Sequence, residues 1–197
     1  MNGFNTYTIG LDLSFLKDYC TNHGRLAHYS KGDYFVKTGE TSRFVGYVDK
    51  GCFKYIVRNV AERKDFITGF AFSNEFVGDY PHCLFHQISD VTIEAETSSD
   101  VYYIDGTDLK ALFETGSQTK ELALNIYKNL FSQVYSQYLD FYRTSARERY
   151  LDLLHRCPQI VQNINLKDIA SYLHVTPTTI STIRREITFG ASSLKMV

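Results

Sequence analysis

The sequence has 197 residues, of which 44% are hydrophobic, so it can bury the core of one large or two small domains. Its formal net charge of −1 is unevenly distributed, with −5 over residues 1–140 and +4 over residues 141–197, so only the C-terminal part suits a polyanion. No stretch approaches the ~18 apolar residues of a membrane span, and the start lacks the plan of a signal peptide, so we expect a cytoplasmic protein without membrane contact.

The sequence lacks the motifs that would mark an enzyme or a metal protein. It has no glycine-rich phosphate loop of the nucleotide-hydrolase type, no nucleophile elbow and no paired histidine ligands at helical spacing. The four cysteines stand far apart without a CxxC pair, at Cys20, Cys52, Cys83 and Cys157. We therefore expect reduced thiols and no enzyme: no catalytic residues, no metal site and no cofactor.

The N-terminal part begins with a short predicted helix over residues 12–20 and continues as a series of short β-rich runs. These runs cover residues 25–30, 33–37, 44–48, 53–59, 65–72, 91–96 and 101–104. Turn residues separate them, and apolar and polar residues alternate within several of them. Many short strands at near-regular spacing predict an antiparallel sandwich, jelly roll or small barrel.

Two further segments precede the middle of the chain. Residues 73–90 break the strand pattern, and irregular segments in a β scaffold often carry ligand contacts, although most are plain connections. A short helix through Leu109, Leu112 and Phe113 follows, with Asp105 or Thr107 as its cap.

Residues 118–142 read as one long amphipathic helix with an unusually wide apolar face. One row on it is formed by Leu122, Ile126, Leu130, Val134 and Phe141, and a second by Ala123, Tyr127, Phe131, Tyr135, Tyr138 and Tyr142. A helix lying on a single domain needs only one stripe, so we expect the other to meet a second copy of the chain. We assign the dimer contacts to Leu122, Ile126, Leu130 and Val134. A helix buried between two domains of a monomer is the alternative.

Residues 166–185 match the packing pattern of a helix-turn-helix. The small residue Ala170 stands fifth, where the two helices would touch, and the apolar positions hold Ile169, Leu173, Val175, Ile180 and Ile183. Asn165 and the pair Thr176-Pro177 provide helix caps. His174 stands where glycine is usual, because the turn often requires a positive φ. A helical hairpin that only contacts proteins would show the same packing.

If the motif docks as such motifs do, its second helix, residues 178–186, enters the major groove of double-stranded DNA. We expect Thr182 and Arg185 to read bases, since arginine reads guanine well, and Thr178 and Thr179 to lie nearer the backbone. Phosphate contacts are expected from Lys167, Arg184 and the arginines between residues 143 and 149. The expected DNA-binding set is Thr176, Thr178, Thr179, Ser181, Thr182, Arg184, Arg185 and Lys167.

The order of these features resembles the CRP/FNR family of bacterial transcription regulators over nearly the whole chain. The runs Lys31-Gly-Asp-Tyr and Phe76-Val-Gly-Asp are similar to a β-roll turn of that family and to the start of its phosphate-binding cassette, and the run from Thr176 to Ser181 resembles the recognition-helix opening of its Bacteroidetes-type branch. The resemblance implies an α+β fold and a homodimer: an antiparallel β-roll (jelly roll) sensor over residues 1–117, a long dimerisation helix over 118–142, and a winged helix-turn-helix over 143–197.

The residues that bind cyclic AMP in members of that family are only partly present. Gly78 matches the glycine of the cassette, Asp79 replaces its glutamate, and Ser89-Asp90 replaces the Arg-Ser pair that holds the cyclic phosphate. A carboxylate repels a phosphate that arginine would pair with, so we expect no cyclic AMP binding in the usual way. The candidate effector-pocket residues are Phe76, Gly78, Asp79, Ser89 and Asp90.

Two alternative functions remain open from the sequence. His82, Cys83 and His86 would allow a haem- or other small-molecule-sensing regulator if they converged. A dimeric protein–protein adaptor without DNA binding would use the same helices. Neither the identity of an effector nor the DNA target, nor the direction of regulation, follows from the residues.

Overall fold

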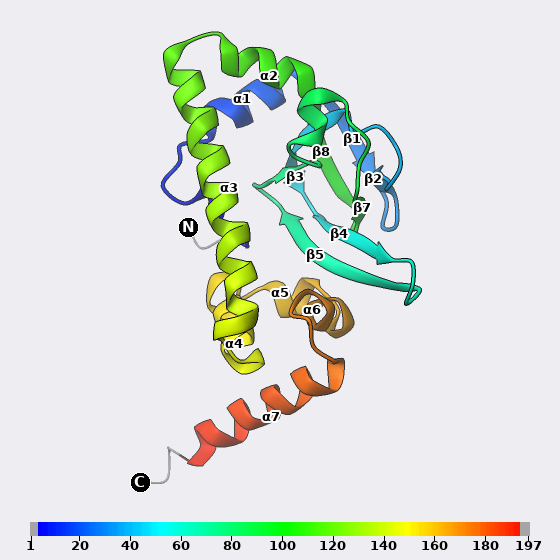
Figure 1. Cartoon of the computed structure of the whole chain (residues 1–197), viewed down its shortest axis with the longest axis vertical. Coiled ribbons are helices and arrows are strands. Elements are labelled where there is room, and N and C mark those ends of the chain that lie inside the picture. Colours follow the sequence, from blue (N-terminus) through cyan, green and yellow to red (C-terminus); the bar gives the residue numbers. More distant parts are fainter. Residues whose placement is uncertain (1–3, 194–197) are drawn as a thin grey trace. The chain divides into compact units, whose positions relative to one another are not determined.

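The computed structural model describes residues 4–193, which divide into an N-terminal unit, Phe4–Gln137, and a C-terminal unit that starts at Tyr138. Helix α3 (Ser117–Arg143) begins in the first unit and ends in the second, so the long helix predicted over residues 118–142 is confirmed (Figure 1). No helix among residues 4–193 combines the length and apolar character that crossing a bilayer requires.

The N-terminal unit is a jelly roll of two four-stranded antiparallel sheets. One sheet has the order β1 (Arg25–Tyr29), β8 (Ser99–Asp105), β3 (Phe44–Lys50) and β6 (Phe76–Val77). The other has the order β2 (Tyr34–Val36), β7 (Thr92–Ala95), β4 (Cys52–Asn59) and β5 (Lys64–Phe72). All seven predicted runs form strands, and only the two-residue β6 was not predicted, because a strand that short carries no periodic signal.

The core of this unit has two parts, set by the alternation of the strands. Val48, Phe53 and Val101 belong to the cluster formed by residues of both sheets. The second cluster joins strand β3 to three helices, α1 (Ser14–His23), α2 (Gly106–Glu114) and α3. Figure 1 shows these helices gathered on one side of the strands. Helix α2 starts where the sequence placed a cap, since the Asp105 carboxylate accepts a hydrogen bond from the Thr107 amide at 2.8 Å.

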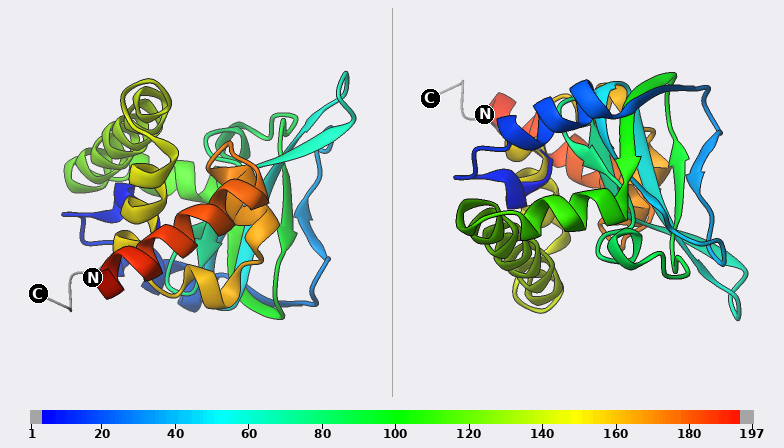
Figure 2. Two further views of the ribbon diagram at one scale, coloured as in Figure 1. Left: turned by 90° about the horizontal axis from the view of Figure 1, so that it is seen from below. Right: turned by 90° about the horizontal axis from the view of Figure 1, so that it is seen from above.

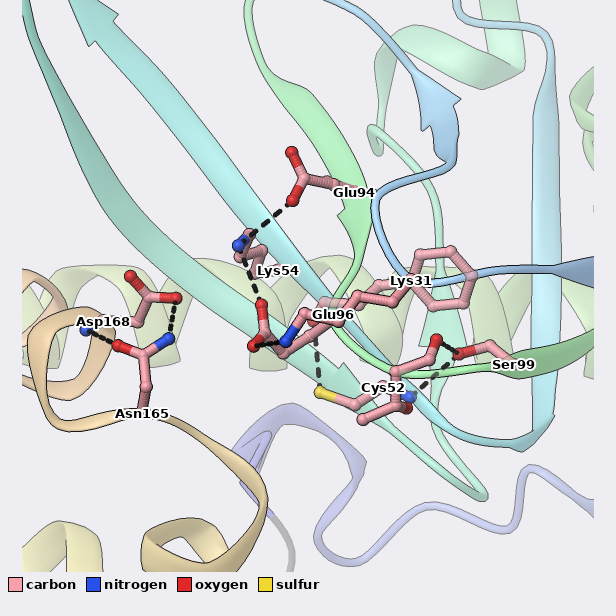
Figure 3. Close-up of polar contacts among 10 residues, drawn as sticks. Lys31, Cys52, Lys54, Glu94, Glu96, Ser99, Asn165 and Asp168 are labelled. Carbon is pink, nitrogen blue, oxygen red and sulfur yellow. Dashed lines mark hydrogen bonds and ion pairs between the residues drawn. The ribbon is translucent and has the colours of Figure 1, made fainter.

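An ion network surrounds the buried carboxylate of Glu96, directly after the end of β7 (Figure 3). The Glu96 carboxylate accepts from Lys31 Nζ at 3.0 Å and from Lys54 Nζ at 2.8 Å, and Lys54 also contacts Glu94 at 3.1 Å. Burial raises the pKa of Glu96, but the hydrogen bonds and charges of the two lysines outweigh it, so the net shift is below the ordinary value. The two lysines therefore keep the buried Glu96 carboxylate in its charged form.

The C-terminal unit is helical. After the end of α3 it contains α4 (Ala146–Arg156), α5 (Ile160–Asn163), α6 (Leu166–Tyr172) and α7 (Pro177–Ser193). Ser145 and Glu148 form a capping box that starts α4, close to the predicted boundary near residues 142–144. No strand follows β8 within residues 4–193, so the β-hairpin of the expected wing is not among the described elements. Helix α7 continues to Ser193 instead.

Candidate functional site

The helix-turn-helix predicted over residues 166–185 is formed by α6 and α7 (Figure 2). Ala170 is fully buried between them, together with Ile169 and Ile180. Because Ala170 ends at Cβ, the two helices can approach closely at this point. The chain turns through His174, whose φ of 54° is the left-handed conformation expected there.

Local hydrogen bonds define both helix starts. Asn165 Oδ1 accepts from the Asp168 amide at 2.9 Å, and Asn165 Nδ2 donates to the Asp168 carboxylate at 2.8 Å (Figure 3). Thr176 Oγ1 accepts from the Thr179 amide at 3.1 Å, which places Pro177 at the first helical position. Both predicted caps are therefore confirmed.

One face of α7 is polar and open to solvent. Thr178, Ser181 and Arg185 are exposed and Thr182 is half-buried, which fits the i, i+3, i+4, i+7 spacing of a single helix face. Ile180 and Ile183 are buried on the other side. The structure thus places Thr182 and Arg185, which the sequence assigned to base contacts, on one face together with Thr178 and Ser181.

The basic residues of the C-terminal unit divide into internal and external ones. Arg149 donates to the carbonyls of Thr144 at 2.6 Å and Leu173 at 3.4 Å, and Arg184 Nε donates to the Tyr150 hydroxyl at 2.6 Å, so both side chains make contacts inside this unit. Arg143 forms an ion pair with Asp140 at 2.8 Å. Arg147 and Lys167 are exposed and are the basic side chains best placed for phosphate contacts.

Helix α3 carries two rows, as expected, but the assignment of dimer contacts to Leu122, Ile126 and Leu130 needs correction. Ile126 is buried, and Leu122 and Leu130 pack against the core cluster of their own unit. Only Val134 of the assigned four is well exposed, at 61%. The periodicity located two stripes, but it could not show which stripe the jelly roll covers.

The stripe left open, here called the exposed row, consists of Leu124, Tyr127, Phe131, Val134, Tyr135, Tyr138 and Tyr142. Phe131 is 71% exposed and stacks on Tyr135 with ring centroids 5.9 Å apart. Contiguous exposed apolar side chains of this size mark an interaction surface. Leu124, which the sequence interpretation did not include, extends the row because it stands seven residues before Phe131.

A cavity of about 460 Å³ lies within the N-terminal unit, between the strands and helices α1, α2 and α3. Of the five candidate effector residues, Phe76, Gly78 and Asp79 line it. Ser89 is buried behind Asp79, and Asp90 is exposed and does not line the cavity. The N-terminal segment also contributes to the lining, through Phe4, Asn5 and Tyr7, a contact for which the sequence carries no local signal.

Polar groups at the cassette already satisfy one another. Ser89 Oγ donates to the Asp79 carboxylate at 2.6 Å, and His82 Nδ1 lies 3.0 Å from the same oxygen. The Tyr55 hydroxyl bonds to both the amide and the carbonyl of Gly78, at 3.2 and 3.3 Å. Among the described residues that line the cavity there is no Lys, Arg or His. These residues do not fit a cyclic phosphate, which needs a cation or free donors.

The side chains considered for haem or metal binding each have a different environment. His82 pairs with Asp79, while His86 Nε2 lies 2.7 Å from the Asp105 carboxylate. Cys83 is fully buried, and burial raises the pKa of its thiol to about 12. Within the described chain, no three His, Cys, Asp or Glu side chains converge as a metal site would require.

Comparisons with known proteins agree with this architecture. Residues 26–116 match the family model described as a cyclic nucleotide-binding domain. FixK2 from Bradyrhizobium japonicum aligns with a TM-score of 0.72 and 18% identity, covering 85% of this chain and 86% of that chain. The c-di-GMP-responsive global regulator CLP of Xanthomonas campestris aligns with a TM-score of 0.64 and 15% identity, covering 91% and 93%.

The Thermus thermophilus catabolite activator protein aligns with a TM-score of 0.56 and 14% identity, covering 94% of this chain and 88% of that chain. Among curated proteins, no sequence matches the chain. At these identities the structural likeness shows the fold, and the family model identifies the domain. The resemblance found in the sequence is thus confirmed for the fold: residues 26–116 match the cyclic nucleotide-binding domain model, and the chain has the fold of solved regulators, among them a putative transcriptional regulator of the CRP/FNR family from Eubacterium rectale.

Proposed function

We propose that the chain is a DNA-binding transcription regulator that acts as a homodimer and responds to a signal in its N-terminal unit. The observation that carries the proposal is the helix-turn-helix itself. Its helices meet at Ala170, turn through His174, and leave the polar face of α7 open to solvent. A helix with this face is suited to the major groove, where side chains must reach base edges.

Arg185 is the principal base reader in this proposal. Its side chain is exposed, and a guanidinium can donate two hydrogen bonds to guanine. Thr176 and Thr179 are engaged with each other at 2.9 Å, and Ser181 Oγ donates to the Pro177 carbonyl at 3.0 Å. Those hydroxyls therefore have less capacity for bases and suit backbone phosphates better.

The exposed row of α3 supports pairing with a second copy. Leu124, Phe131 and Tyr138 stand seven residues apart, as do Tyr127 and Val134, which is the spacing of a coiled-coil seam. Residues 129–139 contain no Asp, Glu, Lys or Arg, so two copies of this face would meet without charge repulsion. In a parallel pair the C-terminal ends of both helices are adjacent, which would present two helix-turn-helix motifs to a palindromic duplex.

The signal in this proposal is not cyclic AMP bound in the usual way. The fold family implies a cyclic nucleotide, but Asp79 and Ser89 bond to each other where a phosphate would need donors. A shift of helix α3 would change the separation of the two recognition helices, and half-sites one turn apart, ~34–36 Å, make affinity sensitive to that separation. A regulator of this kind would act in the cytoplasm of a bacterium, where the chromosome lies.

The test is DNA binding of the full chain, measured by fluorescence anisotropy with a duplex selected from a random pool and with a scrambled duplex, over a salt series. We expect the affinity for both to fall steeply with salt, because phosphate contacts release counterions. Arg185→Ala should weaken the selected duplex by roughly 5- to 150-fold and the scrambled one far less. The matched variant Lys167→Ala should weaken both alike and reduce the salt slope by about one.

A protein that binds no duplex even at low ionic strength would contradict the proposal and favour the adaptor. If Arg185→Ala weakened both duplexes equally, the protein would still bind DNA, but Arg185 would contact phosphate and not bases.

A further inference from the structure

The cavity of the N-terminal unit has mostly apolar walls. Its volume of about 460 Å³ falls in the range of roughly 300–1,000 Å³ that small-molecule sites occupy. The strands and helices contribute aromatic and aliphatic side chains to it, among them Phe70, Phe76, Phe113, Ile126 and Leu130. Such a lining favours a ligand that buries apolar surface.

Most polar groups around the cavity are already engaged. The Tyr55 hydroxyl is bonded to Gly78, and Asp79 to Ser89 and His82. The side-chain carbonyl of Gln133 accepts from Thr6 Oγ1 at 3.0 Å and from the Tyr7 amide at 2.9 Å. A ligand would therefore find few free partners on these groups.

The Tyr80 hydroxyl differs from them. It is buried, and within the described part of the chain it makes no hydrogen bond that meets ordinary geometric limits. Burial, with a smaller contribution from a side-chain hydrogen-bond interaction with the neighbouring Tyr127, raises the pKa of Tyr80, so the phenol is neutral and can donate. Because its contact with Tyr127 does not meet those limits, the buried Tyr80 hydroxyl is poorly satisfied, and a ligand acceptor would recover part of that free energy.

Charge excludes an anionic ligand here. No Lys, Arg or His is among the described lining residues, and the Asp79 carboxylate is. Moving an anion from water into such surroundings leaves it without a counter-charge, which is strongly unfavourable. A cyclic nucleotide carries a full negative charge on its phosphate and so fits this cavity poorly.

We propose that this cavity binds an uncharged, largely apolar molecule with one hydrogen-bond acceptor, to which the Tyr80 hydroxyl donates. The proposal rests on the proposed function, because it names the class of signal that the regulator senses. It gives helix α3 a direct role: Ile126, Leu130 and Val134 line the cavity, and the Tyr80 ring lies 5.3 Å from that of Tyr127 in the exposed row.

The first experiment compares two fluorescent probes that differ in one charged group. N-phenyl-1-naphthylamine is neutral, and 1-anilinonaphthalene-8-sulfonate adds a sulfonate to the same rings. Titrated into the full chain, the neutral probe should saturate at one per chain and bind at least roughly ten-fold more tightly than the sulfonate, because only the sulfonate brings an uncompensated charge. Cyclic AMP should not displace it.

The second experiment tests the hydroxyl with a matched pair of competitors. Benzophenone carries a carbonyl acceptor and diphenylmethane does not, while both place two rings in the cavity. Wild-type protein should prefer benzophenone by roughly five-fold, the size of one ordinary hydrogen bond. Tyr80→Phe should abolish the preference, and the exposed control Tyr34→Phe should retain it.

A third variant fills the cavity. A Cβ built on Gly69, which lines the cavity, would meet only the Tyr55 ring, at 3.8 Å, so Gly69→Leu should fold and should lose neutral-probe binding. Thermal unfolding checks that it folds.

Equal affinity for both probes, displacement by cyclic AMP, or an unchanged benzophenone preference in Tyr80→Phe would overturn the proposal. DNA binding is assayed separately. A wild-type chain that binds DNA but not the neutral probe would contradict only the proposed ligand, and not the proposed function.

Discussion

Glu96 accepts hydrogen bonds from two different lysines, one on each carboxylate oxygen. The carboxylate is 4% exposed and the Lys54 side chain 14%, so this pair is removed from water, whereas Lys31 remains 68% exposed. A buried pair adds little over an apolar pair of equal size, but removing one partner leaves the other charge buried and uncompensated. Without Glu96, Lys54 keeps only Glu94, whose carboxylate is more exposed, so its largely buried charge would be less well compensated.

We expect Glu96→Gln to lower the free energy of unfolding by roughly 3 kcal/mol near pH 7. The pKa of Glu96 is lowered in the folded protein, so its stabilisation is present above the unfolded value, near 4.5, and is lost as the pH falls through the lowered pKa. The difference between variant and wild type should therefore shrink below about pH 4.5. Urea unfolding at several pH values measures it.

The control is Glu94→Gln, the same substitution on a carboxylate 21% exposed. Lys54 keeps Glu96 as its partner in that variant, so a smaller loss is expected. Equal losses for both variants, or a difference that grows with acid, would contradict the assignment.

Helix α3 contributes both to the core of the N-terminal unit and to the exposed row. Its covered side carries Ile126 in the core, and its open side carries Phe131 at 71% exposure. A solvated helix face normally carries charge, but residues 129–139 have none. The second copy that we propose would cover the exposed row and remove this apolar surface from water.

We expect Phe131→Asp to weaken self-association by at least roughly 100-fold, because each of two subunits loses a buried ring and gains a charge in the seam. Sedimentation velocity over a concentration series measures the change. Ser132→Asp places the same charge on the neighbouring exposed residue outside the row and should leave association nearly unchanged. A wild-type chain that stays monomeric, or equal effects of both variants, would exclude the exposed row as the dimer seam.

The cavity and the exposed row adjoin along helix α3, because Val134 belongs to the exposed row and also lines the cavity. A ligand that contacts Leu130 and Val134 therefore touches the element through which two copies would pair. Any effect of the ligand on DNA affinity must then be matched by an equal effect of DNA on ligand affinity, since both describe one coupling free energy.

We expect saturating N-phenyl-1-naphthylamine to change the dissociation constant for the selected duplex by about 5- to 150-fold, and the duplex to change the probe's constant by the same factor. Anisotropy with labelled DNA gives the first ratio, and probe fluorescence with unlabelled DNA the second. Gly69→Leu should show no effect of the probe. A ratio of one in both assays would mean that the cavity binds ligands without controlling DNA.

Local sequence determined the helix-turn-helix and most of the strands. The small residue at Ala170, the caps at Asn165 and Thr176 and the left-handed turn at His174 all lie within about two turns of their partners, so spacing alone reveals them. Turn residues between the runs, with alternation inside several of them, located the seven longer strands for the same reason. The short elements β6, η2 (His82–Phe85) and α5 are too brief to leave a periodic signal.

Only the tertiary structure decided which side of α3 is covered and what chemistry the cavity offers. Ile126 and Phe131 are equally apolar in sequence, yet the jelly roll buries one and leaves the other exposed. The engaged Tyr55 hydroxyl, the poorly satisfied Tyr80 hydroxyl and the N-terminal segment bonded to Gln133 depend on residues that the chain brings together from far apart. Local periodicity carries no record of such contacts, because they follow from how the sheets and helices close on one another.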